Sequence, residues 1–523
     1  MMSRLRLVGA VAAGHPESAR AGAQALAMGG SAVDGACAAA FAGAVAESPL
    51  TGPAAGGFML VGPARGAPVL LDFFVAVPGL GPEGRRLDPR ELRSFTVPFG
   101  GAEQEFHIGP VSVAVPGMVP GLLEAHRRFG RLPLARVVEP AMGLARRGVV
   151  LTGPAAFLHR ILADMLVADP AGARAYAPGG RLLGEGDRLR LPDLADTLEE
   201  IAREGVSAVR EGEIARRLLA VMAERGGLVT ADDLRAYRVL DRRPLVSTRR
   251  GVTLLTNPPP SSGGVLIGAA LDALVGVAAG PDDLAHYRAA IAGGIAADRL
   301  RDAGFAAAIA RGEDPRPPGG ACAQPGPAPD RKPTGSTTHV SVVDADGSIA
   351  SLSSSNGSGA GVVVPGTGIM LNNMLGEQDL NPGGFGQGAP GARMTSMMAP
   401  SLLSRGGRAF AAVGSAGSNR LRSAILQTVL SLVDGGLDAA SAVERPRVHP
   451  EVGVVDVEGG VPDAIAGALE ADGHVLRRWT DRNLFFGGAS VVVDGAHGLD
   501  GAGDPRRGGA AFGVRVDGEV VRL

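Results

Sequence analysis

The first 310 residues carry mainly the apolar spacing that is typical of helices. Small apolar side chains recur at helical intervals over residues 16–28 and 32–46, and Gly29-Gly30-Ser31 between them predicts a helix end followed by a cap. Residues 56–61 and 69–74 favour two paired strands instead. The helical spacing continues over residues 118–129, 132–147, 191–204, 211–225, 264–275 and 281–302. The sequence from Asn257 to Gly264 predicts a rigid turn that leads into one of these helices.

Strands come first in the last third of the chain. Residues 338–344 and 348–354 flank Asp344-Ala345-Asp346-Gly347, which predicts a β-hairpin. Helices in one group and antiparallel strands in another predict an α+β layered fold, and no internal repeat interrupts it. The remaining predicted elements are strands over residues 368–371, 401–403, 410–413, 454–457, 489–493 and 511–516, a helix over 421–433, and a helix from the N-cap Asp438 to Val443.

Residues 311–336 separate these two parts. The stretch reads RGEDPRPPGGACAQPGPAPDRKPTGS, and its seven prolines forbid regular structure. We expect an exposed, mobile connector. Such a stretch is ordinarily a linker between domains, but here a Thr-Thr strand begins directly after it.

Composition narrows the function classes. The 523 residues are 45% hydrophobic, enough for a sizeable core, and the net charge of −2 favours neither nucleic acid nor a membrane surface as a partner. The two cysteines predict no disulfide framework, and the nine histidines lack metal-ligand spacing, so we expect no metal and no cofactor. Residues 1–11 hold no long apolar run and no cleavage signature, so we expect a cytoplasmic protein.

The segment that begins at Gly335 carries the clearest chemistry. Small residues precede Thr337 and Thr338, and an alternating strand starts at once. If the chain cuts itself before Thr337, the new N-terminal threonine holds a nucleophilic hydroxyl and a base in one residue, because a free α-amine has a pKa of about 7.7–8.0. The alternative is that both threonines are ordinary strand residues.

Several motifs together resemble the γ-glutamyltransferases of the N-terminal-nucleophile hydrolase superfamily. They are GSTTHVSVVDADG, PPPSSGG, GTGIMLNN, MTSMMAPS, GSAGSNRL and the opening AAGHPESARAGAQALAMGGSAVDGACAAAFA. The resemblance covers nearly the whole chain. It implies a four-layer αββα sandwich, made as one precursor that cleaves itself between Ser336 and Thr337. The products, residues 1–336 and 337–523, would stay paired in one intertwined domain.

The resemblance also assigns catalytic roles. Thr337 becomes the nucleophile, and Ser355 supplies a hydroxyl that hydrogen-bonds it. Two successive backbone N–H groups, on Gly417 and Ser418, become the oxyanion donors, and a glycine turn before a helix suits that role. The family usually has a second glycine at position 418. His339 shares a strand face with Thr337, and we expect it to be structural.

Substrate binding is assigned in the same way. Asn356 matches a substrate-binding asparagine, Glu377 the acid that holds the α-ammonium of the substrate, and Ser396 a hydroxyl that holds its α-carboxylate. Met397 stands where a second serine is common. Phe74 stands where the best-known members carry an arginine that clamps the α-carboxylate, a bond that phenylalanine cannot supply.

Three functions remain open at this point. The first is transfer of a γ-glutamyl or related acyl group, from an amide such as glutathione to water, an amino acid or a peptide. The second is an acylase with the same nucleophile that acts on another amide, of glutaryl or β-lactam type. The third is an uncleaved, catalytically silent homologue that acts as a binding protein.

Overall fold

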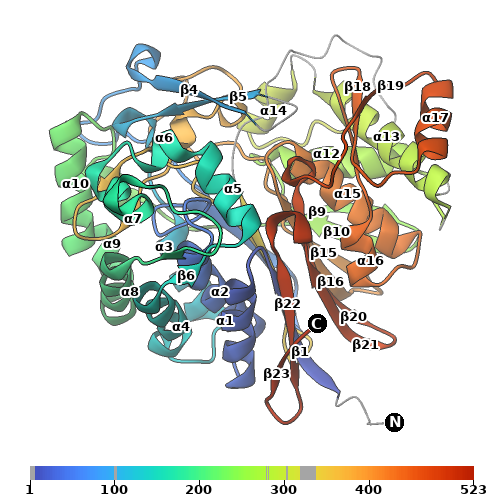
Figure 1. The fold of residues 1–523 in the computed structure, drawn as a ribbon, viewed down its shortest axis with the longest axis horizontal. Helices are drawn as coiled ribbons and strands as arrows, with labels where there is room; N and C mark the ends of the chain where they lie inside the picture. Colours follow the sequence, from blue (N-terminus) through green and yellow to red (C-terminus); the bar gives the residue numbers. More distant parts are fainter. Residues whose placement is uncertain (1–5, 99–102, 278, 281, 302–303, 318–336) are drawn as a thin grey trace.

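Two antiparallel β-sheets lie face to face at the centre of the molecule, and helices cover the outer face of each (Figure 1). The computed structural model describes residues 6–98, 103–277, 279–280, 282–301, 304–317 and 337–523. Most of the predicted connector, and Ser336 with it, lies outside the described residues. The predicted four-layer αββα sandwich is confirmed.

The first sheet has eight strands, and strands from before and after Thr337 are interleaved in it. In spatial order they are β23 (Val520–Arg522), β22 (Ala510–Arg515), β1 (Leu7–Ala13), β11 (Thr338–Val343), β12 (Ile349–Ser355), β2 (Gly56–Gly62), β3 (Val69–Phe73) and β8 (Leu240–Arg242). β11 and β12 form the predicted hairpin, with Val343 opposite Ile349. β11 is a central strand, so every one of its side chains is buried.

The second sheet has six strands and packs on the first through β11, β12, β16 and β20. Its order is β21 (Gly498–Gly503), β20 (Gly488–Gly495), β16 (Arg408–Ala416), β15 (Ser401–Arg405), β10 (Val252–Thr256) and β9 (Leu245–Arg249). Strands from both parts of the chain meet here too, since β9 and β10 precede Thr337 and the other four follow it.

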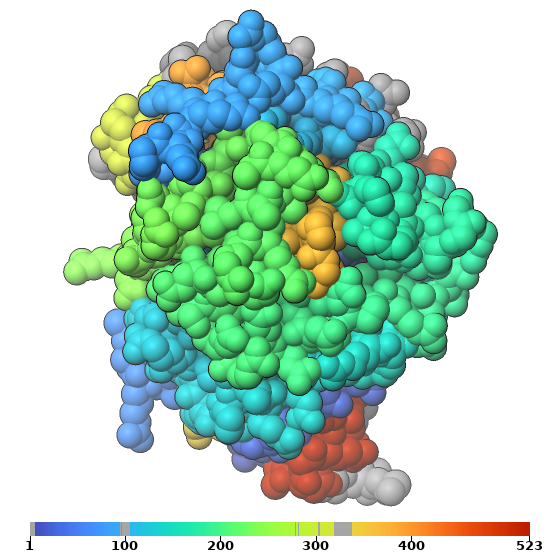
Figure 2. Space-filling model, turned by 90° about the vertical axis from the view of Figure 1, so that its left-hand side faces the viewer, coloured from blue at the N-terminus to red at the C-terminus, as the bar shows by residue number. Residues whose placement is uncertain are grey.

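Helices close the two outer faces. α1 (Pro16–Ala27), α2 (Ala32–Ala46) and α3 (Met118–Phe129) lie on the first sheet, with α4 (Leu134–Arg147) and α8 (Pro192–Glu204) outside them. Elements coloured blue to green make up most of that face, with orange segments of the later chain at its centre and near its top and a red segment at its lower end (Figure 2). α12 (Ser262–Ala273), α13 (Asp283–Leu300), α15 (Arg420–Val433) and α16 (Ala439–Glu444) form the layer on the second sheet.

Small residues explain how closely the first helical layer packs. Every residue of α2 is buried, and a Cβ on Gly22 in α1 would lie 2.7 Å from the carbonyl oxygen of Gly35 in α2. Only glycine leaves room for such an approach. The predicted cap between the helices is a capping box, in which Ser31 and Asp34 satisfy each other's backbone N–H groups.

Three apolar cores correspond to the interfaces between the four layers. Val340 and Val342 of β11 face the first helical layer, and Val429 of α15 belongs to the core of the second. The middle core lies between the sheets and includes Phe58 and Phe74. Among the described residues, no helix is both long and apolar enough to cross a membrane.

The sequence prediction missed β1, β8, β9 and β10. Helix α4 begins at Leu134 rather than 132, because Pro133 takes the cap position. The predicted strand over 368–371 is only the two-residue β14 (Ile369–Met370). The remaining elements are α5 (Gly153–Ile161), α6 (Ala163–Leu166), α7 (Pro170–Tyr176), α9 (Ser207–Arg210), α10 (Glu213–Arg225), α11 (Ala231–Ala236), α14 (Phe305–Ala310), α17 (Asp463–Ala471), β4 (Arg93–Pro98), β5 (Glu103–Ile108), β6 (Val149–Val150), β7 (Arg188–Leu189), β13 (Val363–Val364), β17 (Val448–Glu451), β18 (Val454–Val457) and β19 (Val475–Arg478).

Candidate active site

Thr337 lies at the start of the central strand of the first sheet. It directly precedes β11, and 5% of its surface is exposed. Thr338 pairs with Ser354 across the hairpin, so the antiparallel register brings Thr337 opposite Ser355. Side chains alternate along a strand, so Thr337 and Ser355 share the face that looks toward the second sheet.

A cavity of about 330 Å³ opens at this point, between the ends of the two sheets. The cavity brings together five of the predicted site residues from four separate segments of the chain. They are Thr337, Ser355, Glu377, Ser396 and Ser418. The residues that line it are Phe74, Thr337, Ser355, Met374, Glu377, Asp379, Leu380, Ser396, Met397, Met398, Ser418 and Leu421.

The turn that bears Ser396 is held by the serines of the PPPSSGG motif. The Ser396 carbonyl oxygen accepts hydrogen bonds from the Ser262 N–H at 2.7 Å and from the Ser261 hydroxyl at 3.0 Å. The Ser396 hydroxyl oxygen accepts one from the Met398 N–H at 3.1 Å. The predicted rigid turn into α12 therefore fixes a wall of the cavity.

Glu377 lies between two short 3-10 turns and is almost fully buried, with 3% of its surface exposed. Within the described part of the chain, its Oε1 has no hydrogen-bond partner. Burial raises the pKa of this carboxyl to about 8, the nearby Asp379 adds to the rise, and the Ser358 backbone N–H opposes it. An unpaired buried carboxyl beside a cavity is a site for a cationic or hydrogen-bonding ligand.

Two asparagines fasten the loop that carries Glu377. The Asn372 side chain donates to the carbonyl oxygens of Ala54 and Ala114, both at 2.9 Å. The Asn373 Oδ1 accepts from the Ser358 N–H at 2.8 Å. These bonds tie the loop to the segments just before β2 and before α3 and to the turn after β12, so Glu377 is held by backbone anchors on two sides.

The predicted oxyanion turn joins β16 to α15. Gly417 has a φ of +119° and Ser418 a φ of +54°, so both are in the left-handed region. A Cβ on Gly417 would lie 2.9 Å from the Cα of Gly487, which requires glycine there. Ser418 lines the cavity with Thr337, and its hydroxyl donates to Asp379 at 3.3 Å.

Not every predicted residue meets in the cavity. Asn356 is not among the lining residues, and its Nδ2 donates to the backbone carbonyl of Met370 at 3.2 Å. The substrate-binding role of Asn356 stays a prediction, and so do the catalytic roles assigned to the other residues. Asp379 was missed, although it lies only two residues after Glu377.

His339 lies between the sheets, where we expected a structural residue. Its Nδ1 lies 2.8 Å from the Ser353 hydroxyl, and its Nε2 lies 3.1 Å from the Ser341 hydroxyl. Burial lowers the pKa of the imidazole to about 3, so the ring is neutral at physiological pH. A Cβ on Gly414 would lie 2.2 Å from this ring.

Phe74 forms an apolar wall of the cavity where an arginine was expected from the resemblance. Its ring stacks on Phe58 with centroids 5.4 Å apart. Among the described residues that line the cavity there is no arginine, lysine or histidine. The cavity therefore joins apolar and hydroxyl-bearing walls to two carboxyl groups, Glu377 and Asp379.

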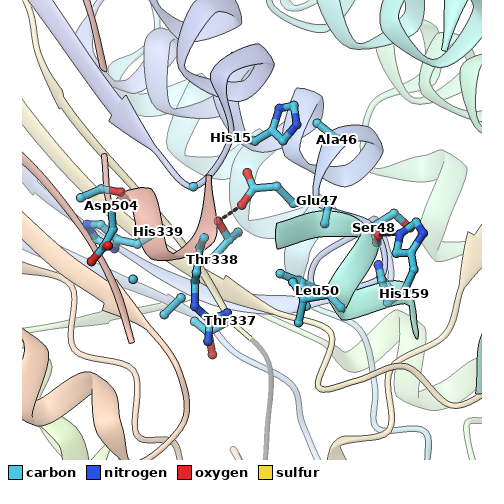
Figure 3. Close-up of a pocket in the computed structure, with 18 residues that line it drawn as sticks. His15, Ala46, Glu47, Ser48, Leu50, His159, Thr337, Thr338, His339 and Asp504 are labelled. Atoms are coloured by element: carbon cyan, nitrogen blue, oxygen red, sulfur yellow. Dashed lines mark hydrogen bonds between the residues drawn. The ribbon is translucent and has the colours of Figure 1, made fainter. Parts of the chain in front are cut away.

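A second cavity, of about 550 Å³, also reaches Thr337 (Figure 3). The Glu47 carboxylate points at Thr338 and accepts a hydrogen bond from its hydroxyl, and the Ser18 hydroxyl donates to the other carboxylate oxygen at 2.7 Å. Burial raises the pKa of Glu47, against these hydrogen bonds. Burial also lowers the pKa of His15 in the same cavity to about 4. Thr337 thus stands between two cavities. The smaller one also holds Ser355, Glu377, Ser396 and Ser418, whereas Asn356 and Gly417 are not among its lining residues.

The fold and the buried threonine at the head of a central strand define the class of the protein, an enzyme of the N-terminal-nucleophile hydrolase type. The family model for gamma-glutamyltranspeptidase matches residues 18–292 and 296–514. The chain belongs to the γ-glutamyltranspeptidase family.

Relatives with two kinds of name match nearly the full chain. The chain is 35% identical over 511 residues to the acylase ACY 1 proenzyme of Pseudomonas sp. (strain SE83), covering 90% of this chain and 87% of the relative. It is 32% identical over 545 residues to the glutathione hydrolase proenzyme of Pseudomonas aeruginosa, covering 97% and 95%. The crystal structure of cephalosporin acylase from Bacillus halodurans has a TM-score of 0.78 at 26% identity, covering 98% of this chain and 97% of that one.

Proposed function

We propose that the protein is a self-processing enzyme that moves a γ-glutamyl or related acyl group from an amide to water or an amine. The observation that carries the proposal is the convergence of Thr337, Ser355, Glu377, Ser396 and Ser418 on one cavity. A nucleophile, a neighbouring hydroxyl and a glycine turn before a helix are the parts that acyl transfer requires.

In the precursor, the Thr337 hydroxyl attacks the carbonyl carbon of Ser336, and the acyl group passes from nitrogen to oxygen. Water then hydrolyses the ester, which leaves a Ser336 carboxylate and a free Thr337 α-amine. In turnover, the α-amine takes the hydroxyl proton as the Thr337 oxygen attacks the donor carbonyl. The proton passes to the leaving amine as the C–N bond breaks. Water or an amine then attacks the acyl-threonine ester and restores Thr337.

The Gly417 and Ser418 backbone N–H groups are proposed to hold the oxyanion of each tetrahedral intermediate. Their place at the turn before α15 supports this role, because N–H groups at a helix start are oriented toward an anion. Ser355 shares its strand face with Thr337 and is proposed to orient the hydroxyl.

An acylase that acts on another amide is a second candidate. The specific observation in its favour is Phe74. This residue lines the cavity of about 330 Å³ beside Thr337, from here on called the acyl cavity, and it offers no bond to an α-carboxylate. The similarity to an acylase proenzyme supports it as well. Both candidates share the nucleophile and the self-cleavage.

Purified protein tests the proposal. We expect a denaturing gel to show two chains, and N-terminal sequencing of the smaller one to read Thr-Thr-His from Thr337. Thr337→Ala leaves a single chain without activity toward γ-glutamyl or other acyl p-nitroanilides, whereas Thr337→Ser retains slow cleavage. A wild-type chain that stays whole and releases no nitroaniline from any donor would refute the proposal and support the binding protein instead.

A further inference from the structure

The acyl cavity has an uneven charge. Its described lining includes two carboxyl groups, Glu377 and Asp379, and no basic side chain. Glu377 is the one with an unpartnered buried oxygen, whereas Asp379 receives the Ser418 hydroxyl. A buried carboxylate is stabilised when a cation pairs with it. The cavity is therefore suited to a ligand that brings its own positive charge.

The arginines closest in sequence to the lining residues do not themselves line the cavity. Arg393 precedes Ser396 by three residues, but its Nε lies 3.1 Å from Asp72 and its guanidinium stacks 4.7 Å from the Tyr237 ring centroid. It also donates to the Phe74 carbonyl oxygen, which lies on the backbone behind the cavity wall.

Arg420 and Arg422 stand on either side of the cavity residue Leu421. The Arg422 guanidinium lies 2.7 Å from Asp298. The Nε of Arg420 donates to the Phe485 carbonyl oxygen at 3.1 Å, and its guanidinium lies 4.8 Å from the Phe485 ring centroid. The Nη1 of Arg420 is buried and has no hydrogen-bond partner within the described part of the chain. Neither Arg393 nor Arg420 lines the cavity. A carboxylate that entered the cavity would meet a phenylalanine, methionines and two carboxyl groups, with hydroxyls as its hydrogen-bond donors.

Apolar residues surround the place where the family resemblance locates an α-carboxylate. Phe74, Met397 and Met398 lie there beside Ser396, and Leu380 and Leu421 complete the apolar lining. Transfer of an unpaired carboxylate from water to such surroundings is strongly unfavourable. A donor with a hydrogen atom or an alkyl group in place of the α-carboxylate would bury apolar surface at no such cost.

We propose that the preferred acyl donor carries an ammonium group at the position of the glutamyl α-carbon and no carboxylate there, as in a 4-aminobutanoyl amide. The inference rests on the proposed function, because it uses the same acyl-threonine chemistry. The ammonium pairs with Glu377, and the acyl chain lies along the methionines with its carbonyl at Thr337. The covalent step is unchanged: the Thr337 oxygen bonds to the acyl carbon, the C–N bond breaks, and the amine leaves with the proton. A glutaryl group, which has a carboxylate and no ammonium, is the least suitable of the simple donors.

Four p-nitroanilides separate the contributions of the two charges. They bear 4-aminobutanoyl, γ-glutamyl, butanoyl and glutaryl groups, and they are compared with the wild-type, self-cleaved enzyme. We expect kcat/KM for 4-aminobutanoyl to exceed that for γ-glutamyl by about tenfold or more, and that for glutaryl by about a hundredfold or more, since each lost or added charge contact is worth at least ~1.4 kcal/mol. A γ-glutamyl donor that equals or exceeds 4-aminobutanoyl, or a glutaryl donor that exceeds butanoyl, overturns the proposal.

Two variants test the assigned residues. Glu377→Gln should lower the ratio of 4-aminobutanoyl to butanoyl hydrolysis about tenfold or more, because the ammonium loses its partner. Phe74→Arg should raise the ratio of γ-glutamyl to 4-aminobutanoyl hydrolysis, whereas the apolar control Phe74→Leu should keep the wild-type ranking. If Phe74→Arg does not fold, the proposal is still tested by the wild-type ranking of the four donors and by the ratio of 4-aminobutanoyl to butanoyl hydrolysis in Glu377→Gln.

Failure of this inference differs from failure of the proposed function. An enzyme that cleaves itself at Thr337 but ranks the donors in another order, or hydrolyses none of the four, contradicts only the donor preference. A chain that neither cleaves itself nor releases nitroaniline contradicts both.

Discussion

Glu377→Gln should make the unliganded protein more stable at alkaline pH, although it removes a proposed substrate contact. The carboxyl has a pKa of about 8 in the folded chain, against an ordinary value of 4.5. A pKa that is raised by folding adds stability that is fully present below about pH 4.5 and is lost as pH rises through about 8. Glutamine has no such penalty, so the difference between the two proteins grows across this window.

The size of the effect follows from the shift. A difference of about 3.5 pKa units corresponds to at most ~5 kcal/mol at 1.36 kcal/mol per unit. The effective dielectric around a buried charge in a protein exceeds that of a dry interior, so we expect about 2–5 kcal/mol above pH 8.5. An unfolding entropy of roughly 1.1 kcal/mol/K for a chain of this length converts this into a rise in Tm of about 2–4 °C.

The comparison is best made in a Thr337→Ala background, which keeps one chain throughout. Thermal unfolding of Thr337→Ala and Thr337→Ala/Glu377→Gln is followed by calorimetry from pH 5 to pH 9. Glu83→Gln in the same background is the control, because Glu83 is exposed. A Tm difference that does not grow with pH, or a Glu377→Gln protein that is less stable at pH 9, would show that Glu377 is not an unpaired buried acid.

Two further predictions concern Gly414 in β16 and Ser418 in the turn that follows this strand. Gly414→Ala should lower the free energy of unfolding by about 1–3 kcal/mol, because its Cβ would lie 2.2 Å from the His339 ring. Gly467→Ala is the control. Gly467 lies at an exposed helical position where a Cβ has nothing within 4 Å, so this variant should be neutral or more stable by up to ~1 kcal/mol. Equal losses for both variants would contradict the packing argument. Ser418→Gly should keep self-cleavage and change stability by less than about 1 kcal/mol, whereas Ser418→Val should lose about 1–3 kcal/mol, since a β-branched residue is disfavoured at the φ of +54° that position 418 adopts. Self-cleavage is read on a gel and stability by calorimetry, and a Ser418→Val protein as stable as the wild type would refute the backbone argument.

Much of the fold could be predicted from local pattern. α3 begins and ends at the residues that the spacing predicted, and Asp438 caps α16 as expected. The turn sequence Asp344-Ala345-Asp346-Gly347 also predicted the hairpin of β11 and β12. β1 was missed because a short strand of small residues has no distinctive pattern of its own, and it is defined by pairing with β11 and β22 on either side.

The sequence by itself, together with its resemblance to the family, predicted which groups react. A threonine after small residues and before a strand, a glycine turn before a helix, and an acid in a short loop are local features. Phe74 could be identified in the same way as a departure from the expected arginine. These features indicate acyl-transfer chemistry because the nucleophile, the base and the oxyanion donors each have a local signature in the sequence.

Only the tertiary structure decided which of these residues meet and what charge surrounds them. It brings Thr337, Glu377, Ser396 and Ser418 to one cavity, and it leaves Asn356 bonded to backbone outside the lining. It also pairs Arg393 with Asp72 and leaves Arg393 outside the cavity lining. The physical reason is that the stability of a charge depends on the dielectric and the partners that folding assembles around it, and residues far apart in the chain supply both.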